Sequence, residues 1–378
     1  MSWITGVGMT SFGRHQDSDT LSLMSEAAIA ALKDAGLERR QIDGLICGYS
    51  TTHPHLMLST VFAEHFGLMP SIAHAMQLGG ATGLAMLMLA SELVLSGAAE
   101  HVLVVAGENR LSGQSSVDTL RSLAQVGHPT YEVPLGPTIP AYYALVASRY
   151  MHKYGVTEED LAEHAVVMRS HAVNHPGAHH KQLIGLSDVM SSRVIASPLK
   201  LLDCCPVSDG GAAFVVSRER TGDIGVQVIG CAQAHTHQHV SAARDLTQFG
   251  ASRSLEQAVA KSGATVADAD YFAIYDSFTI TLTILLEELG IAPRGEAGKM
   301  AREGWFGRDG RFPLNTHGGL LSYGHCGCAG AMAHLVEAQL QLTGRAEGRQ
   351  VKSPTVALLH GDGGVLSSHV TAFLERVR

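Results

Sequence analysis

The sequence predicts an α/β fold built from two similar halves. Short apolar runs alternate with longer alanine-rich stretches along the 378 residues, which is the pattern of buried strands alternating with helices. A glycine-rich segment in the first third of the chain recurs near its end. Hydrophobic residues make up 46% of the chain and charged residues 16%. This composition favours a tightly packed globular protein over a disordered or coiled-coil chain.

The internal repeat defines the two halves. Gly-Ala-Thr-Gly at residues 80–83 precedes an apolar helix that reaches Gly97, and Gly-Cys-Ala-Gly at residues 327–330 precedes one that reaches Gly344. The two intervals between first and last glycine are equal. Self-similarity of this kind indicates one supersecondary unit used twice.

Further elements surround each copy. A helix that ends at a glycine comes first, then a strand, then the repeated segment, then a second strand. Glycine suits the left-handed position that closes a helix. Because such apolar strands alternate with helices, we expect them to be mostly parallel. The expected helices are residues 21–36 and 254–263, and the expected strands are residues 43–49, 101–107, 270–276 and 355–361.

These elements suggest domain boundaries. The first half spans residues 1–225, and the second spans residues 226–378, beginning with an apolar strand. A stretch of about residues 111–200 is richer in proline, histidine and polar residues. Within this stretch we expect helices at residues 141–154 and 158–173.

Charge and composition exclude several functions. The net charge of −8 gives none of the overall positive charge that favours binding to nucleic acid or an anionic membrane. The longest apolar stretch, residues 81–95, contains Ser91 and Glu92 and is too short for a membrane span. The first residues lack the form of a signal peptide, so a cytoplasmic protein is expected. The six cysteines form no Cys-x-x-Cys pair, and the histidine tract at residues 235–239 is expected to be an exposed loop, so no metal site is predicted.

The segment around Gly80 resembles the part of thiolases that carries their nucleophilic cysteine. There the family reads Cys-x-Ser/Thr-Gly followed by a buried helix, and this chain keeps the pattern with Gly80 in place of the cysteine. The resemblance implies a duplicated, five-layered αβαβα fold, in which the stretch of about residues 111–200 is a loop domain inserted into the first half. It also implies that covalent acyl transfer is lost, because glycine has no side chain to hold the acyl group.

A second motif contains a candidate catalytic histidine, His325. Residues 315–325 resemble the thiolase segment Asn-x-x-Gly-Gly-x-x-x-x-Gly-His, whose histidine helps to form an oxyanion hole, and His325 matches it. A neutral imidazole that donates from Nε2 can stabilise an enolate oxygen. Alternatively, His325 caps the glycine-rich turn.

A tyrosine stands at a third motif. Residues 274–278, Ile-Tyr-Asp-Ser-Phe, occupy the place of the family's Asn-Glu-Ala-Phe, so Tyr275 replaces a residue of the oxyanion hole. A phenol there can donate a hydrogen bond or exchange a proton. Alternatively, Tyr275 is a packing residue on an apolar strand.

The final motif has lost its cysteine. Thiolases carry a catalytic Cys-x-Gly-Gly-Gly loop near the C-terminus, but here no cysteine follows Cys328 and the loop of residues 359–367 contains His360 and Gly363. We expect Gly80, His360 and Gly363 to line the oxyanion and substrate pocket. Loss of both cysteines with retention of His325 indicates a changed reaction.

Steroid side-chain aldolases, sterol-carrier-protein-like members of the family without the cysteine, share this pattern. The resemblance implies retro-aldol cleavage of a β-hydroxyacyl-CoA, with Tyr275, Tyr323 and His325 as catalytic residues. Coenzyme A enters as part of the substrate, and no other cofactor is expected. The resemblance also implies a homodimer, and a small OB-fold/zinc-ribbon protein as a possible partner.

Two alternatives remain open. The chain could be a thiolase or acyltransferase that uses an unconventional thiol, for which Cys326 and Cys328 are the candidates. It could also be a non-catalytic subunit that binds acyl-CoA or lipid. The sequence does not specify the acyl group.

Overall fold

A nine-stranded mixed sheet runs through the molecule in the order β3-β2-β4-β7-β1-β8-β11-β10-β9. The computed structural model describes the backbone of residues 1–378 and every side chain except that of Ser116. The strands of the large sheet are β1 (Trp3–Met9), β2 (Gly44–Gly48), β3 (Ile72–Met76), β4 (His101–Asn109), β7 (Asp209–Ser217), β8 (Gly225–His235), β9 (Tyr271–Ile274), β10 (Val356–Gly363) and β11 (Ser368–Val377).

The two halves of this sheet meet edge to edge. Strands β1 and β8 pair only at Trp3 with Gln227 and at Ile4 with Val226. The sequence did not predict this connection. The four strands expected from the sequence are parallel within each half, β2 to β4 and β9 to β10, as predicted. The sheet as a whole is mixed, because every pairing that involves β1, β7, β8 or β11 is antiparallel. A tight turn joins β10 to β11, and such a short connection requires antiparallel strands.

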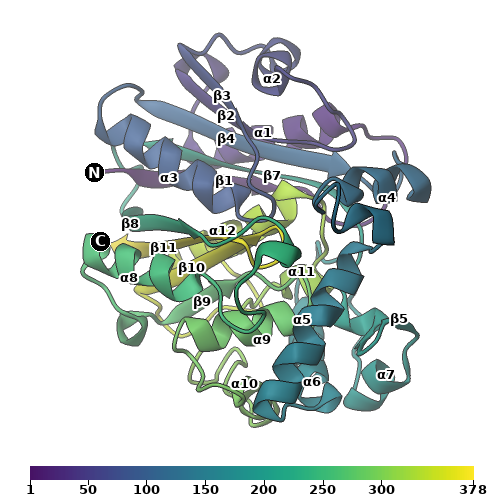
Figure 1. The fold of residues 1–378 in the computed structure, drawn as a ribbon. Coiled ribbons are helices and arrows are strands. Elements are labelled where there is room, and N and C mark those ends of the chain that lie inside the picture. Colours follow the sequence, from purple (N-terminus) through teal and green to yellow (C-terminus); the bar gives the residue numbers. More distant parts are fainter.

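Helices form the remaining layers (Figure 1). Helix α1 packs on one outer face of the first half-sheet, and α8 packs on the outer face of the second. Between the half-sheets lie α3 and α12, which contact each other and strands of both halves. The expected five-layered αβαβα arrangement is therefore confirmed. The α-helices outside the inserted region are α1 (Thr20–Ala35), α2 (Leu58–Phe66), α3 (Thr82–Leu95), α8 (Ala251–Ser262), α9 (Thr279–Glu288), α10 (Ala297–Arg302), α11 (Gly319–Ser322) and α12 (Cys328–Leu342).

The central helices explain why the repeated segment is so apolar. A helix between two sheets has no solvent-facing side, so its sequence is hydrophobic all round. Gly83 of α3 lies against Met332 of α12, and a Cβ at Gly83 would be 2.8 Å from Met332 Cγ. Both helices begin within a repeated glycine segment, α3 at Thr82 and α12 at Cys328. Their N-termini therefore bring residues 80–83 and 325–330 to the centre of the molecule.

The inserted region contains α4 (Ser116–Ala124), α5 (Ile139–Tyr154), α6 (Glu158–Ala172) and α7 (Leu186–Ser191), together with the small hairpin of β5 (Val194–Ala196) and β6 (Leu199–Lys200). The predicted helices at residues 141–154 and 158–173 match α5 and α6 to within two residues. Helix α5 contacts α9 of the second half and so brings the inserted region against the second half-sheet. Among the described helices, none is long and apolar enough to cross a membrane.

Candidate active site

Tyr275 fills the space in which a side chain at residue 80 would lie. A Cβ built on Gly80 would overlap the ring carbon Cζ and the hydroxyl of Tyr275, and also the carbonyl oxygen of Asp362. Residue 80 is where the resemblance places the nucleophilic cysteine. The glycine and the tyrosine are therefore coupled, because a cysteine side chain and this phenol cannot occupy the same volume.

The loops around Gly80 approach each other closely. A Cβ at Gly79 would lie 2.8 Å from the Gly364 amide nitrogen, and a Cβ at Gly363 would overlap the carbonyl oxygen of Leu78. Only glycine allows backbones to meet at this distance. The predicted pocket residues Gly80 and Gly363 thus lie on two touching segments, the loop before α3 and the end of β10.

The Tyr275 hydroxyl contacts the predicted oxyanion histidine. Tyr275 Oη and His325 Nε2 are 3.1 Å apart. The amide of Gly327 donates to His325 Nδ1 at 3.3 Å, so Nδ1 is an acceptor and the neutral ring carries its proton on Nε2. His325 therefore donates to Tyr275, and the hydroxyl proton of Tyr275 remains available for a substrate.

His325 stays neutral. Its side chain is largely buried, and burial together with the nearby Arg110 guanidinium lowers the pKa of His325 to about 3. Arg110 is itself held in a buried ion pair with Glu108, and Glu108 also accepts from Thr51 Oγ1 at 3.2 Å. A neutral imidazole with a fixed tautomer is suited to donate to a developing enolate.

Tyr275 lies beside a second phenol. Tyr275 is 6% exposed, and burial, followed by the neighbouring Tyr143 and Cys205, raises its pKa well above the usual value. Tyr143, on α5, donates to the Gly364 carbonyl at 2.9 Å, and its hydroxyl lies 3.4 Å from Asp362 Oδ2. The inserted region thus places a polar group next to the site.

Tyr323 is not brought together with Tyr275. Its hydroxyl donates to the carbonyl of Thr10 at 3.3 Å, and its ring packs between Phe12 and His175. Among the described residues, no hydrogen bond joins Tyr323 to Tyr275 or His325. A catalytic role for Tyr323 stays a prediction.

The side chain of His360 belongs to a separate buried hydrogen-bond network. Its Nδ1 is 2.9 Å from Thr371 Oγ1, and its Nε2 is 3.2 Å from His369 Nδ1. Its carbonyl accepts from the Tyr275 amide at 2.9 Å. His360 therefore supports Tyr275 through the backbone, and its side chain is occupied by its own neighbours.

The candidate thiols are sequestered. Cys326 and Cys328 are at most 1% exposed. Burial raises the pKa of Cys328 to about 12 and that of Cys326 above its usual range. Cys328 Sγ lies 3.6 Å from the carbonyl oxygen of Tyr49. Because the thiolate is the nucleophile, these surroundings oppose a displaced catalytic cysteine.

Sequence reasoning missed Tyr143 and Arg110. Arg110 lies just beyond β4, and Tyr143 lies in a helix of the inserted region, so both are far from the motifs along the chain. The only available signal was the pair of adjacent tyrosines at residues 142 and 143. That pattern is common in buried helices and does not identify a site.

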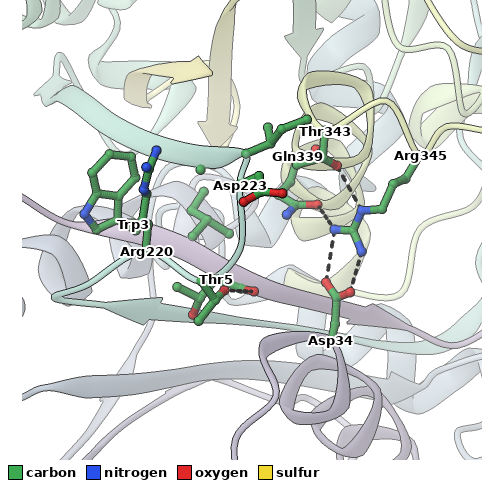
Figure 2. A pocket seen from close by; sticks show the side chains of 12 residues that line it. Trp3, Thr5, Asp34, Arg220, Asp223, Gln339, Thr343 and Arg345 are labelled. Carbon is green, nitrogen blue, oxygen red and sulfur yellow. Dashed lines mark hydrogen bonds and ion pairs between the residues drawn. The ribbon is translucent and has the colours of Figure 1, made fainter. Parts of the chain in front are cut away.

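Two cavities lie elsewhere. One of about 360 Å³ opens between β1 and the end of α12; there Arg345 binds Asp34, Gln339 and Thr343 (Figure 2). Another, of about 330 Å³, lies between α4 and the start of α5. Neither is lined by Gly80, Tyr275 or His325. Within the described part of the chain, no group of three or more His, Cys, Asp or Glu residues could hold a metal ion.

Comparisons with known proteins identify the family of this chain. The family model "Thiolase, N-terminal domain" matches residues 2–220, and the model "Thiolase C-terminal domain-like" matches residues 232–376. The solved structure of the "Ltp2-ChsH2(DUF35) aldolase" superimposes with a TM-score of 0.85 at 31% identity, covering 99% of this chain and 97% of that chain.

Two curated relatives carry different activities in their names. The steroid side-chain-cleaving aldolase of Thermomonospora curvata is 34% identical, covering 84% of this chain and 85% of the relative. The acetyl-CoA acetyltransferase of Methanothermobacter thermautotrophicus is 31% identical, covering 97% of this chain and 98% of the relative. The chain therefore belongs to the thiolase superfamily, in the sterol-carrier-protein-like branch that includes aldolases without the nucleophilic cysteine.

Proposed function

We propose that this protein is an acyl-CoA enzyme that cleaves a β-hydroxyacyl-CoA by a retro-aldol reaction without a covalent acyl-enzyme. The observation that carries the proposal is the Tyr275 phenol in the space of the missing residue-80 side chain, in contact with His325. The site therefore offers proton transfer and enolate stabilisation where the family places a nucleophile.

The reaction can be assigned to two residues. Tyr275, as its phenolate, takes the proton of the β-hydroxyl; the β-carbon becomes a carbonyl, and the bond between the α- and β-carbons breaks. The electron pair of that bond passes to the thioester enolate. Once Tyr275 is protonated, the Nε2–H of His325 turns from the phenol to the enolate oxygen, which accepts from it. Return of the proton from Tyr275 to the α-carbon gives the shortened acyl-CoA and regenerates the phenolate. Atoms and charge balance without free coenzyme A.

The alternatives have less support. An acyltransferase with an unconventional thiol would need Cys326 or Cys328, whose burial favours the protonated thiol. A silent binding subunit would have no need for the ordered contact between Tyr275 and His325. Names of relatives include both aldolase and acetyltransferase, so the distinction rests on the site itself.

Partners follow from the same relatives. The name of the superimposed aldolase structure includes a second, DUF35 protein, and we propose that a small protein of this kind accompanies the present chain. We also propose a homodimer paired through the first half-sheet, whose edge strand β3 is only half covered. Light scattering at micromolar concentration should give twice the chain mass, and a monomer would remove this part of the proposal.

The test is release of a ketone or aldehyde from a β-hydroxyacyl-CoA, with and without the partner. Tyr275→Phe keeps the ring, so it should fold normally while turnover falls on the order of 100-fold or more. His325→Ala should lose a comparable amount, about 3 kcal/mol in the barrier. Full activity in Tyr275→Phe would show that the phenol only packs and that the proposed chemistry is wrong.

A further inference from the structure

The residues on either side of Tyr275, Ile274 and Asp276, form hydrogen bonds with the segment that carries His325. Before it, the Ile274 amide donates to Asn315 Oδ1 at 2.9 Å, and Asn315 Nδ2 donates to the Ile274 carbonyl at 2.7 Å. Asn315 holds this position with a positive φ of 44°, an uncommon conformation for a residue other than glycine. The end of β9 is thereby fixed to the start of the histidine motif.

After Tyr275, the Asp276 carboxyl makes a denser set of contacts. It is 0% exposed and accepts from the amides of Leu320 at 2.7 Å and Leu321 at 3.3 Å. Its Oδ1 also lies 3.1 Å from His334 Nε2. Gly319 leaves room for it, because a Cβ there would overlap Asp276 Oδ2.

These contacts are made by helices on both sides of His325 in the chain. Leu320 and Leu321 belong to α11, which ends before His325, and His334 belongs to α12, which begins after it. Building on the proposed function, we propose that Asp276 is a positioning residue that holds His325 Nε2 at hydrogen-bond distance from Tyr275 Oη. The Asp276 carboxyl, next to Tyr275 in the chain, binds both helices that flank His325. It thereby fixes the position of these helices relative to the phenol of Tyr275.

Stability alone does not account for this carboxyl. Burial raises the pKa of Asp276, and the hydrogen bonds from His334 and the two amides only offset that cost. Replacing a buried charged group with well-packed apolar residues is often neutral or stabilising. A directional acceptor instead selects one arrangement of the two helices, which is what an ordered Tyr275–His325 contact requires.

The decisive variant is Asp276→Asn, with Asp203→Asn as the matched control. Asp203 is also buried, 4% exposed, and accepts from the Lys200 amide and Thr279 Oγ1, each at 2.9 Å. Asp276→Asn should lower kcat at least 10-fold with KM within 3-fold of wild type, because an amide nitrogen replaces one acceptor oxygen. Asp203→Asn should lose stability but keep kcat. His334→Gln should shift kcat in the same direction as Asp276→Asn.

A second readout does not depend on turnover. In imidazole NMR of the full-length protein, the His325 Nε2 proton should be protected, assigned by its loss in Tyr275→Phe, and should exchange faster in Asp276→Asn than in Asp203→Asn. Equal exchange and equal kcat in the two folded aspartate variants would overturn the positioning role. If wild type releases no carbonyl product, the proposed function fails, while the NMR comparison still decides whether Asp276 orders His325.

Discussion

At the scale of single residues, the pairing of Gly80 with Tyr275 defines this site. The absence of a cysteine was visible in the sequence, and so was the unusual tyrosine. Their interdependence was not, because residues 80 and 275 are far apart in the chain and only the folded structure places the phenol over the glycine.

This pairing predicts that Gly80→Ala is damaging. The added methyl would displace Tyr275, costing about 1–3 kcal/mol of stability and most of the turnover. The control is Gly185→Ala, where φ is −105° and the nearest neighbour of the new Cβ is 3.8 Å away. Thermal unfolding and carbonyl release measure both effects. Wild-type stability and turnover in Gly80→Ala would show that residue 80 accommodates a side chain beside Tyr275 and would contradict the pairing.

The raised pKa of Tyr275 predicts the pH dependence of the rate. Because burial and its neighbours hold the phenol in its neutral form, the reactive phenolate is a minor species near pH 7. Its fraction grows about tenfold for each pH unit. We therefore expect kcat to rise continuously between pH 7 and pH 9. A rate that is flat over this range would exclude the Tyr275 phenolate as the base.

At the scale of secondary-structure elements, the sequence predicted where helices end better than it predicted how the strands pair. Helices α1 and α8 end where the sequence placed their caps, at Gly36 with φ 69° and Gly263 with φ 71°. These signals are local, so the sequence reveals them. The parallel direction of β2 and β4 and of β9 and β10 followed from their alternation with helices. The antiparallel pairings and the joining of β1 to β8 depend on contacts distant in sequence, and apolar runs look the same in parallel and antiparallel sheets.

The inserted helix α5 provides an element-scale prediction. Tyr143→Phe keeps the stacking on Phe278, whose ring centroid is 4.2 Å away, but removes the hydrogen bond to the Gly364 carbonyl. Hydrogen exchange should accelerate at residues 363–367 and stability should fall by about 1 kcal/mol. Tyr142→Phe, on the same helix with its hydroxyl near Glu132, is the control. Equal exchange in both variants would show that α5 does not restrain the glycine loop.

At the scale of the whole molecule, buried neutral histidines make the fold sensitive to acid. Burial lowers the pKa of His164, which is 1% exposed, to about 4, and His369 behaves similarly. Because the pKa in the unfolded chain is about 6.5, their contribution to stability is complete above that pH and is lost as the pH falls towards 4. Each contributes a slope on the order of 1 kcal/mol per pH unit.

Denaturant unfolding at several pH values tests this expectation. Neither ring nitrogen of His164 has a hydrogen-bond partner among the described residues, so His164→Met removes the group that must be protonated. The variant should lose less stability than wild type between pH 6.5 and pH 4. His65→Met, at an exposed position of α2, should leave the slope unchanged. Parallel curves for His164→Met and wild type would contradict this origin of acid sensitivity.

In the proposed reaction, Gly80 in place of the cysteine and Tyr275 beside it replace covalent acyl transfer with proton transfer. This is tested by following a β-hydroxyacyl-CoA through turnover while the intact mass of the protein is measured. We expect one carbonyl product and one shortened acyl-CoA for each substrate consumed, no requirement for free coenzyme A, and unmodified protein throughout. An acyl adduct on Cys326 or Cys328, or cleavage that depends on added coenzyme A, would contradict it.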